Sequence, residues 1–185
     1  MNGLRHGVAC LAIVMLAASP RALGQTRHDP LTQAEIDQLR DAAQEADQRL
    51  KLYVQFARER LVALEKMRAD PKTKADDRGA ETHDDLDDFV TIYDELNENL
   101  DNFADRKDDL RKPLKAIIEA DAEFQSKLRA LKDSAGVSPQ EAEQYEFVMR
   151  DALQTVDDSI DDHRKMLAEQ EEAAKNKKKK PERPQ

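Results

Sequence analysis

The sequence predicts an all-α protein: an elongated antiparallel three-helix bundle, or coiled coil, with a long middle helix kinked at a proline. Apolar residues recur at alternating steps of three and four over three long stretches, which is the spacing of a coiled-coil seam. Charged residues make up 37% of the chain and aromatic residues only 4%, a composition that suits helices with hydrated outer faces and is thin for a β-sandwich core. Both glycines outside the N-terminal segment, Gly79 and Gly136, fall between the three stretches, and only one proline, Pro113, falls inside a stretch beyond its first position.

The first 24 residues have the pattern of a secretory signal peptide. A basic start is followed by an apolar run over 8–18, and Ala22 and Gly24 are the small residues that signal peptidase requires, so cleavage is expected between Gly24 and Gln25. The apolar run is shorter than the roughly 20 residues that span a bilayer, so no transmembrane segment is expected after cleavage. The protein is therefore expected to be exported, and to be periplasmic or secreted.

The mature chain is acidic and has no cysteine. The whole sequence holds 39 acidic and 30 basic residues, with a formal net charge of −9, and its single cysteine, Cys10, lies within the signal. After cleavage the chain therefore cannot form disulfides or use a thiolate as nucleophile or metal ligand. Because an acidic body repels phosphates, nucleic acid is not expected as a partner.

The first helix is expected over 33–69, after a linker over 25–31. Thr32 and Glu35 have the spacing of a capping box, in which the hydroxyl and the carboxylate each accept a hydrogen bond from a free backbone N–H group. The apolar seam of this helix is interrupted at one position, where Arg60 stands.

The second helix is expected over 83–133, after a polar loop over 70–82, with Thr82 or His83 as its N-cap. Its apolar register passes through Pro113 without a shift. We therefore predict one continuous helix kinked at Pro113, where the missing N–H group and the ring cost about 3 kcal/mol.

The third helix is expected over 139–175. Ser138 and Glu141 have the spacing of a second capping box, and a proline occupies the first helical position, where no N–H partner is lost. Because short loops make sequential helices antiparallel, residues 32–175 are predicted to form one bundle. Residues 176–185 are rich in lysine with nothing apolar to bury, so we expect a disordered basic tail that is free to touch anionic envelope polymers.

Three polar residues, Lys107, Ser159 and His163, are candidates for a buried polar layer near the kink. With the last hairpin turning at its glycine, His163 should face Asp109. Such a layer would be a wet level that fixes the helix register or admits a small ligand. The alternative is an ordinary proline kink, with Lys107 extending to water or pairing with Glu45 at the edge of the seam. Asp121 also occupies a seam position, which we interpret as the level where the seam opens to solvent.

Motifs for catalysis are missing from the sequence. G-x-S-x-G, Walker and dinucleotide fingerprints do not occur, and neither do H-E-x-x-H or E-x-x-H patterns. We therefore predict no catalytic residue, no cofactor and no metal site, and a protein that is not an enzyme. Acidic pairs such as Asp157 and Asp158 are interpreted as hydrated helix faces, with a divalent-cation surface as the alternative.

The function expected from these patterns is that of a non-enzymatic interaction or structural (spacer) protein of the bacterial envelope, with a protein partner or self-association. One alternative is a periplasmic stress or chaperone-like protein that binds unfolded clients on an apolar helical surface. A weaker alternative is divalent-cation buffering by acidic helix faces. Exposed apolar area separates the first two, because clients need a contiguous apolar patch whereas a spacer buries its seams.

Overall fold

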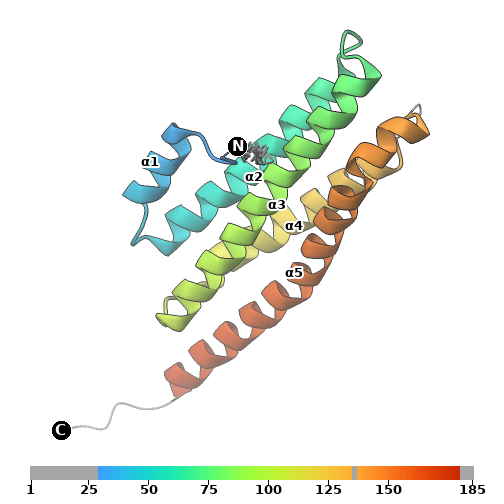
Figure 1. The fold of residues 1–185 in the computed structure, drawn as a ribbon. Coiled ribbons are helices and arrows are strands. Elements are labelled where there is room, and N and C mark those ends of the chain that lie inside the picture. Colours follow the sequence, from blue (N-terminus) through green and yellow to red (C-terminus); the bar gives the residue numbers. More distant parts are fainter. Residues whose placement is uncertain (1–28, 135–136, 180–185) are drawn as a thin grey trace, which may run out of the picture.

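The computed structural model describes residues 29–134 and 137–179, and all regular structure in these residues is helical (Figure 1). The helices, in chain order, are α1 (Gln33–Asp41), α2 (Ala46–Ala69), α3 (Ala75–Asp105), α4 (Arg111–Lys132) and α5 (Pro139–Lys179). Helices α2 to α5 form a bundle, and the short α1 packs against α2. The all-α prediction is confirmed, whereas the arrangement in three long helices is wrong.

Two antiparallel hairpins, α2–α3 and α4–α5, lie side by side in the bundle (Figure 1). Between the hairpins, α3 packs against α5 and α2 packs against α4. Helices α3 and α4, although consecutive in the chain, therefore occupy opposite corners of the bundle. This topology brings side chains of α3, α4 and α5 together at its centre, where the candidate site lies.

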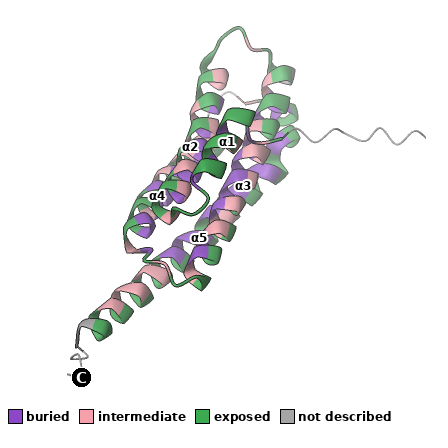
Figure 2. Ribbon diagram, turned by 90° about the vertical axis from the view of Figure 1, so that its left-hand side faces the viewer, coloured by how far each residue is buried: buried purple, intermediate pink, exposed green. Residues whose placement is uncertain are grey.

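The apolar seams are buried along the inward faces of the helices (Figure 2). Phe103 of α3 and Val156 of α5, for example, are 3% and 0% exposed. An aromatic group fills the centre: the rings of Phe89 and Phe124 meet edge to face with centroids 5.4 Å apart, and Tyr93 stacks on Phe89 at 5.7 Å. Such pairs add about 0.5–1.5 kcal/mol to the stabilisation that burial alone provides.

The first predicted helix, 33–69, is broken into α1 and α2 by a turn over 42–45. The capping box is confirmed, since Thr32 N–H donates to Glu35 at 2.6 Å and Glu35 N–H donates to the Thr32 hydroxyl at 3.3 Å. The reason for the break lies in α2: Arg60 makes a bidentate ion pair with Glu35 and donates to the Pro30 carbonyl at 2.7 Å. The residue that interrupted the seam thus holds α1 folded back on α2.

The second predicted helix, 83–133, is likewise two helices, and the break lies over 106–110. Lys107 adopts a left-handed conformation, with φ of 69°. The Lys107 N–H group donates to the Ala104 carbonyl and the Asp108 N–H group donates to the Phe103 carbonyl, which is the Schellman pattern that ends a helix. The heptad spacing did not indicate this break, because the spacing of apolar residues continues in α4 as if the helix were uninterrupted.

The sequence predicted that Pro113 kinks a helix, and this prediction is wrong. Pro113 lies in the first turn of α4. The first four N–H groups of a helix have no helical partner, so a proline at the third position removes no hydrogen bond. The expected cost of about 3 kcal/mol therefore does not arise. Pro113 is instead buried against the other helices.

The loop between the first two long segments is shorter than predicted, because α3 begins at Ala75 rather than at residue 83. Thr82 is not a cap but a fully buried helical residue, whose hydroxyl donates to the Arg78 carbonyl at 2.6 Å. The additional helical turns, residues 75–82, carry no apolar stripe. They are held to the bundle by ion pairs, described below, which heptad spacing cannot reveal.

At the other end of the bundle, α5 runs past the α3–α4 connection (Figure 2). The Gln170 side chain accepts from Leu110 N–H and donates to the Asp108 carbonyl, so α5 caps the break between those helices. The helix continues to Lys179, four residues beyond its predicted end at 175. The predicted signal peptide and the end of the predicted tail, residues 180–185, lie outside the described residues. None of the described helices is long and apolar enough to cross a membrane.

Candidate functional site

A network of polar side chains lies buried where α3, α4 and α5 meet. The Tyr93 hydroxyl of α3 donates to one carboxylate oxygen of Asp121 on α4, at 2.7 Å. His163 Nδ1 of α5 lies 2.9 Å from the other oxygen of the same carboxylate. Asp121 is 0% exposed and His163 is 3% exposed, so both groups are withdrawn from water. Burial, followed by the Asp121 charge, raises the pKa of Tyr93, which keeps its hydroxyl protonated as a donor.

Asn97 and Ser159 complete this network. The Asn97 amide nitrogen donates to the Ser159 hydroxyl at 3.0 Å, which leaves the amide oxygen 3.1 Å from His163 Nε2. Both ring nitrogens of His163 then face oxygen acceptors, a pattern that is satisfied when both carry hydrogen. The arrangement is therefore a buried Asp–His pair joined by a hydrogen bond and supported by three neutral hydrogen-bonding groups.

The predicted polar layer is found only in part. Ser159 and His163 do lie together and are buried. Lys107 does not join them, because it is exposed at the end of α3. His163 meets Asp121 rather than Asp109, so the register predicted for the last hairpin is wrong. That register assumed that the end of α4 and the start of α5 lie at the same level of the bundle, which they do not.

Asp121 is the largest departure from the sequence interpretation. Its seam position was expected to mark the level where the bundle opens to solvent, yet the residue is completely buried. Sequence reasoning did not identify Tyr93 and Asn97 as its hydrogen-bonding companions. An acid and a histidine on seams of different helices were the available signal, and only the helix register could pair them.

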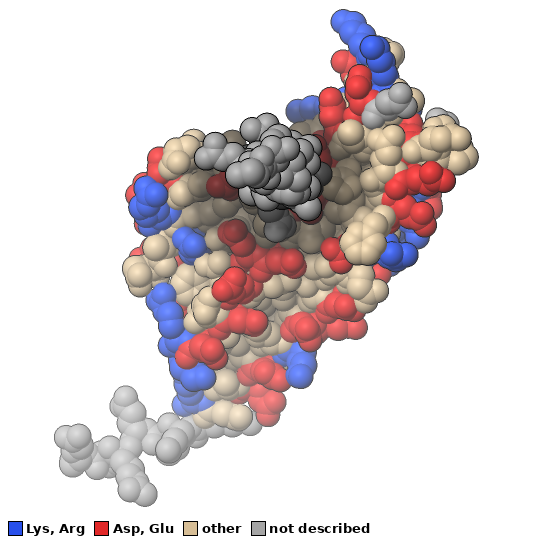
Figure 3. All heavy atoms as spheres, in the orientation of Figure 1, with Lys and Arg blue, Asp and Glu red and all other residues tan. Residues whose placement is uncertain are grey.

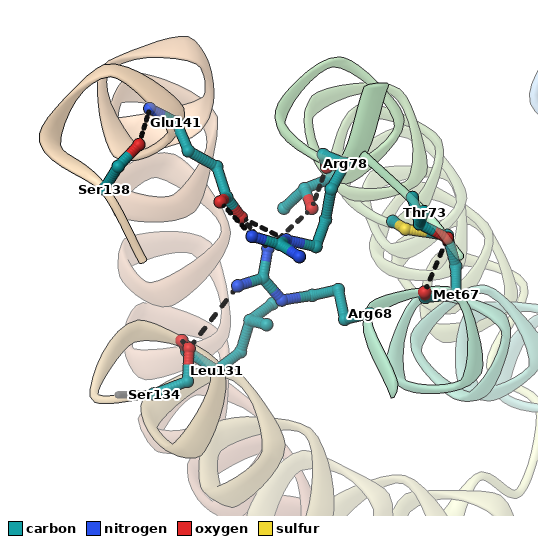
Figure 4. Close-up of polar contacts among 9 residues, drawn as sticks. Met67, Arg68, Thr73, Arg78, Leu131, Ser134, Ser138 and Glu141 are labelled. Carbon is teal, nitrogen blue, oxygen red and sulfur yellow. Dashed lines mark hydrogen bonds and ion pairs between the residues drawn. The ribbon is translucent and has the colours of Figure 1, made fainter. Parts of the chain in front are cut away.

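A second polar cluster lies near the end of the bundle opposite the α3–α4 connection, where α2, α3 and α5 come together (Figure 4). Glu141, with a side chain 1% exposed, accepts from Arg78 at 2.7 and 2.5 Å and from Arg68 at 3.2 Å. Arg68 also donates to the Thr82 hydroxyl at 2.9 Å, and its guanidinium lies over the Tyr145 ring. One carboxylate therefore ties three helices through two guanidinium groups.

The second predicted capping box is only half formed as a consequence. Ser138 does accept from Glu141 N–H, at 3.2 Å. The Glu141 carboxylate, however, is directed to the two arginines instead of returning to the cap. Hydrogen bonds from Arg78, partly opposed by burial, lower the pKa of Glu141 below its ordinary value of 4.5. The reason for the difference is that charge-assisted bonds to guanidinium are stronger than a bond to a neutral backbone N–H.

Asp85 on α3 is a carboxyl group held in an unfavourable environment. Burial, followed by the charges of Asp88 and Glu81, raises its pKa to about 6 although Arg60 acts in the opposite direction. A folded-state pKa above the ordinary value means that folding favours the uncharged form. Its stabilising contribution is therefore complete below the ordinary pKa of 3.8 and is lost as the pH rises through about 6.

Replacing Asp85 with asparagine is expected to raise the free energy of unfolding by about 1 kcal/mol at pH 7.5 and to change it little at pH 4. The full shift corresponds to about 3 kcal/mol, which partial exposure to water reduces. Urea unfolding at both pH values measures the difference. Asp84→Asn is the matched control, because that side chain is 79% exposed. An equal gain from both substitutions, or a larger gain for Asp85→Asn at pH 4, would contradict the assignment.

Acidic side chains gather over α3 and α5 on the face shown in Figure 3, with basic side chains mostly along its edges. Burial and the charge of Asp151 on α5 raise the pKa of Asp94 on α3, so acids of these two helices approach one another. Within residues 29–134 and 137–179, no group of three His, Cys, Asp or Glu side chains is placed to hold a metal ion.

Comparison with known proteins gives no relative: no family model, no curated protein and no solved structure matches the chain. What the two clusters can do follows from their geometry alone. The Tyr93–Asp121–His163 network is closed to solvent, and each of its side chains is hydrogen-bonded to another side chain of the network. Its chemistry is that of a structural link among three helices.

Proposed function

We propose that this protein is a non-enzymatic helical module of the bacterial envelope, acting by protein contact or as a spacer. The observation that carries the proposal is the completeness of its polar interior. Every buried side-chain nitrogen and oxygen atom in the described part of the chain has a hydrogen-bond partner within the protein. Groups of the types used in catalysis, such as His163 and Asp121, are thus engaged in joining helices.

The exposed apolar surface favours this proposal over binding of unfolded clients. Phe147, 72% exposed on α5, is the one large hydrophobic side chain that stands in water among the described residues. A client-binding surface needs a contiguous apolar patch of several hundred Å². The protein instead buries its seams, as expected for a rigid module whose surface contacts are specific and polar.

Photo-crosslinking in the native envelope tests the mode of action. A photoreactive phenylalanine analogue replaces Phe147, whose exposed ring leaves the core undisturbed, and a matched variant carries the analogue at Glu98 on α3. We expect one or a few discrete adducts from at least one position. A broad set of unrelated proteins that increases after heat stress would contradict the proposal and indicate client binding.

Export of the protein is a separate part of the proposal and rests on the N-terminal sequence pattern alone. We expect the mature protein in a periplasmic or culture-medium fraction, beginning at Gln25. Mass spectrometry of the intact protein from each fraction determines the first residue. Protein found only inside the cell with its first 24 residues attached would contradict export without affecting the crosslinking result.

A further inference from the structure

A cavity of about 380 Å³ lies beside the Glu141 cluster, between α2 and α4, with Arg78 of α3 and the connection from α4 to α5 completing its wall. Arg68, Arg78 and Lys127 line it, together with Glu65 and Ser134. The guanidinium groups of Arg68 and Arg78 lie together between Glu141 and Ser134 (Figure 4). Three cations from three helices thus converge on one small space.

The charges of the described side chains that line this cavity do not balance. Lys127 pairs with Glu65 at 2.7 and 2.8 Å, so these two charges compensate each other. Arg68 and Arg78 share the single carboxylate of Glu141. Among the described side chains, one positive charge therefore remains without a counter-charge, although the Arg68 side chain is only 10% exposed. A charge this far withdrawn from water is costly unless an anion accompanies it.

Hydrogen-bond donors for such an anion are also present. Arg78 uses Nε and Nη2 on Glu141, and its Nη1 donates to none of the described residues. Arg68 Nη2 has only a long contact of 3.5 Å, to the Ser134 hydroxyl. These groups and the Lys127 ammonium are donors without acceptor capacity, and guanidinium presents its donors in the fork that matches an oxyanion.

From the cavity, the excess charge and the free donors together, we propose that this pocket binds a small oxyanion, a phosphate or carboxylate group, between Arg68, Arg78 and Lys127. The volume admits a free anion or the anionic end of a small metabolite. Binding would add an interaction among α2, α3 and α4 at the end of the bundle where α3 has no apolar stripe. The inference is independent of the proposed envelope function.

Isothermal titration calorimetry at constant ionic strength tests the proposal, with inorganic phosphate, citrate and chloride as the probes. Phosphate or citrate is expected to bind at millimolar concentration or tighter, and the tighter of the two identifies the group as phosphate or carboxylate. Thermal unfolding gives a second readout: with a Kd of about 1 mM, 20 mM ligand shifts the folding equilibrium about 20-fold.

Two rim substitutions change the charge of the pocket without touching the buried cluster. Glu65→Gln removes a negative charge and is expected to tighten binding several-fold, whereas Lys127→Gln removes a cation and is expected to weaken it about tenfold. Lys115→Gln is the matched control, because Lys115 pairs with Glu171 outside the pocket. No binding up to 20 mM, or equal affinities in all four proteins, would overturn the proposal.

Discussion

Replacing Asp121 with alanine is expected to lower the free energy of unfolding by about 3–5 kcal/mol, the largest loss we expect from a single polar residue. The substitution leaves His163 charged or unpaired in the core and removes the acceptor of the Tyr93 hydroxyl. Removing one partner of a buried ion pair has a cost of this size, because the other group stays desolvated without compensation. Urea unfolding at neutral pH measures the change.

Companion variants separate the ion pair from simple loss of volume. Leucine at both Asp121 and His163 is expected to be less destabilising than Asp121→Ala, because neither member of the buried pair is left without its partner. His163→Leu alone is expected to lower the melting temperature, since it deprives the buried Asp121 of its partner. Asp101→Ala, on the exposed side of α3, is the control and should change stability by no more than about 0.5 kcal/mol. A comparable effect of Asp121→Ala and Asp101→Ala would contradict the network.

Glu141→Ala is expected to cost about 3–5 kcal/mol, because two guanidinium groups lose their shared carboxylate. The change should concentrate at one end of the bundle, where Glu141 connects Arg68 of α2 with Arg78 of α3. Hydrogen exchange should therefore accelerate first in the opening turns of α3, which have no apolar seam of their own. Glu143→Ala on the same helix is exposed and serves as the control.

The pH dependence of Glu141 follows from its lowered pKa. A folded-state pKa below the ordinary 4.5 means that the ionised form stabilises the fold. This contribution is complete above about pH 4.5 and is lost as the pH falls through the folded-state pKa. Glu141→Gln should thus lose less stability than the native protein between pH 5 and pH 3, as measured by urea unfolding. An acid transition unchanged by Glu141→Gln would contradict the assignment.

Helix breaks show where heptad spacing stops being informative. The spacing is the same on either side of the 106–110 connection, so the sequence presented α3 and α4 as one helix. Lys107 gave no signal, because a lysine in the left-handed region is uncommon and glycine is the residue expected there. Pro113 did mark the neighbourhood of the break, but a proline is compatible with both a kink and a first turn.

The candidate site was visible in the sequence as single residues and not as groups. His163 and Asp121 stood out because polar side chains occupied seam positions, and Ser159 stood out because the predicted register placed it opposite Pro113. Their partners could not be assigned, since one helical turn of register error brings a different residue opposite His163. Arg68, Arg78 and Glu141 were missed, because charged residues flanking a seam are ordinary in solvated helices.

The sequence by itself determined the helical structure, the direction of each apolar face and the Thr32–Glu35 cap. Local spacing along one chain segment is enough to set these features. The number of helices, their pairing and the partners of each buried charge depend on contacts between residues far apart in the chain. The tertiary structure alone decided that Asp121 lies in the core and that two arginines share Glu141. The physical reason is that burial and charge compensation are properties of a three-dimensional environment, which no repeat in the sequence records.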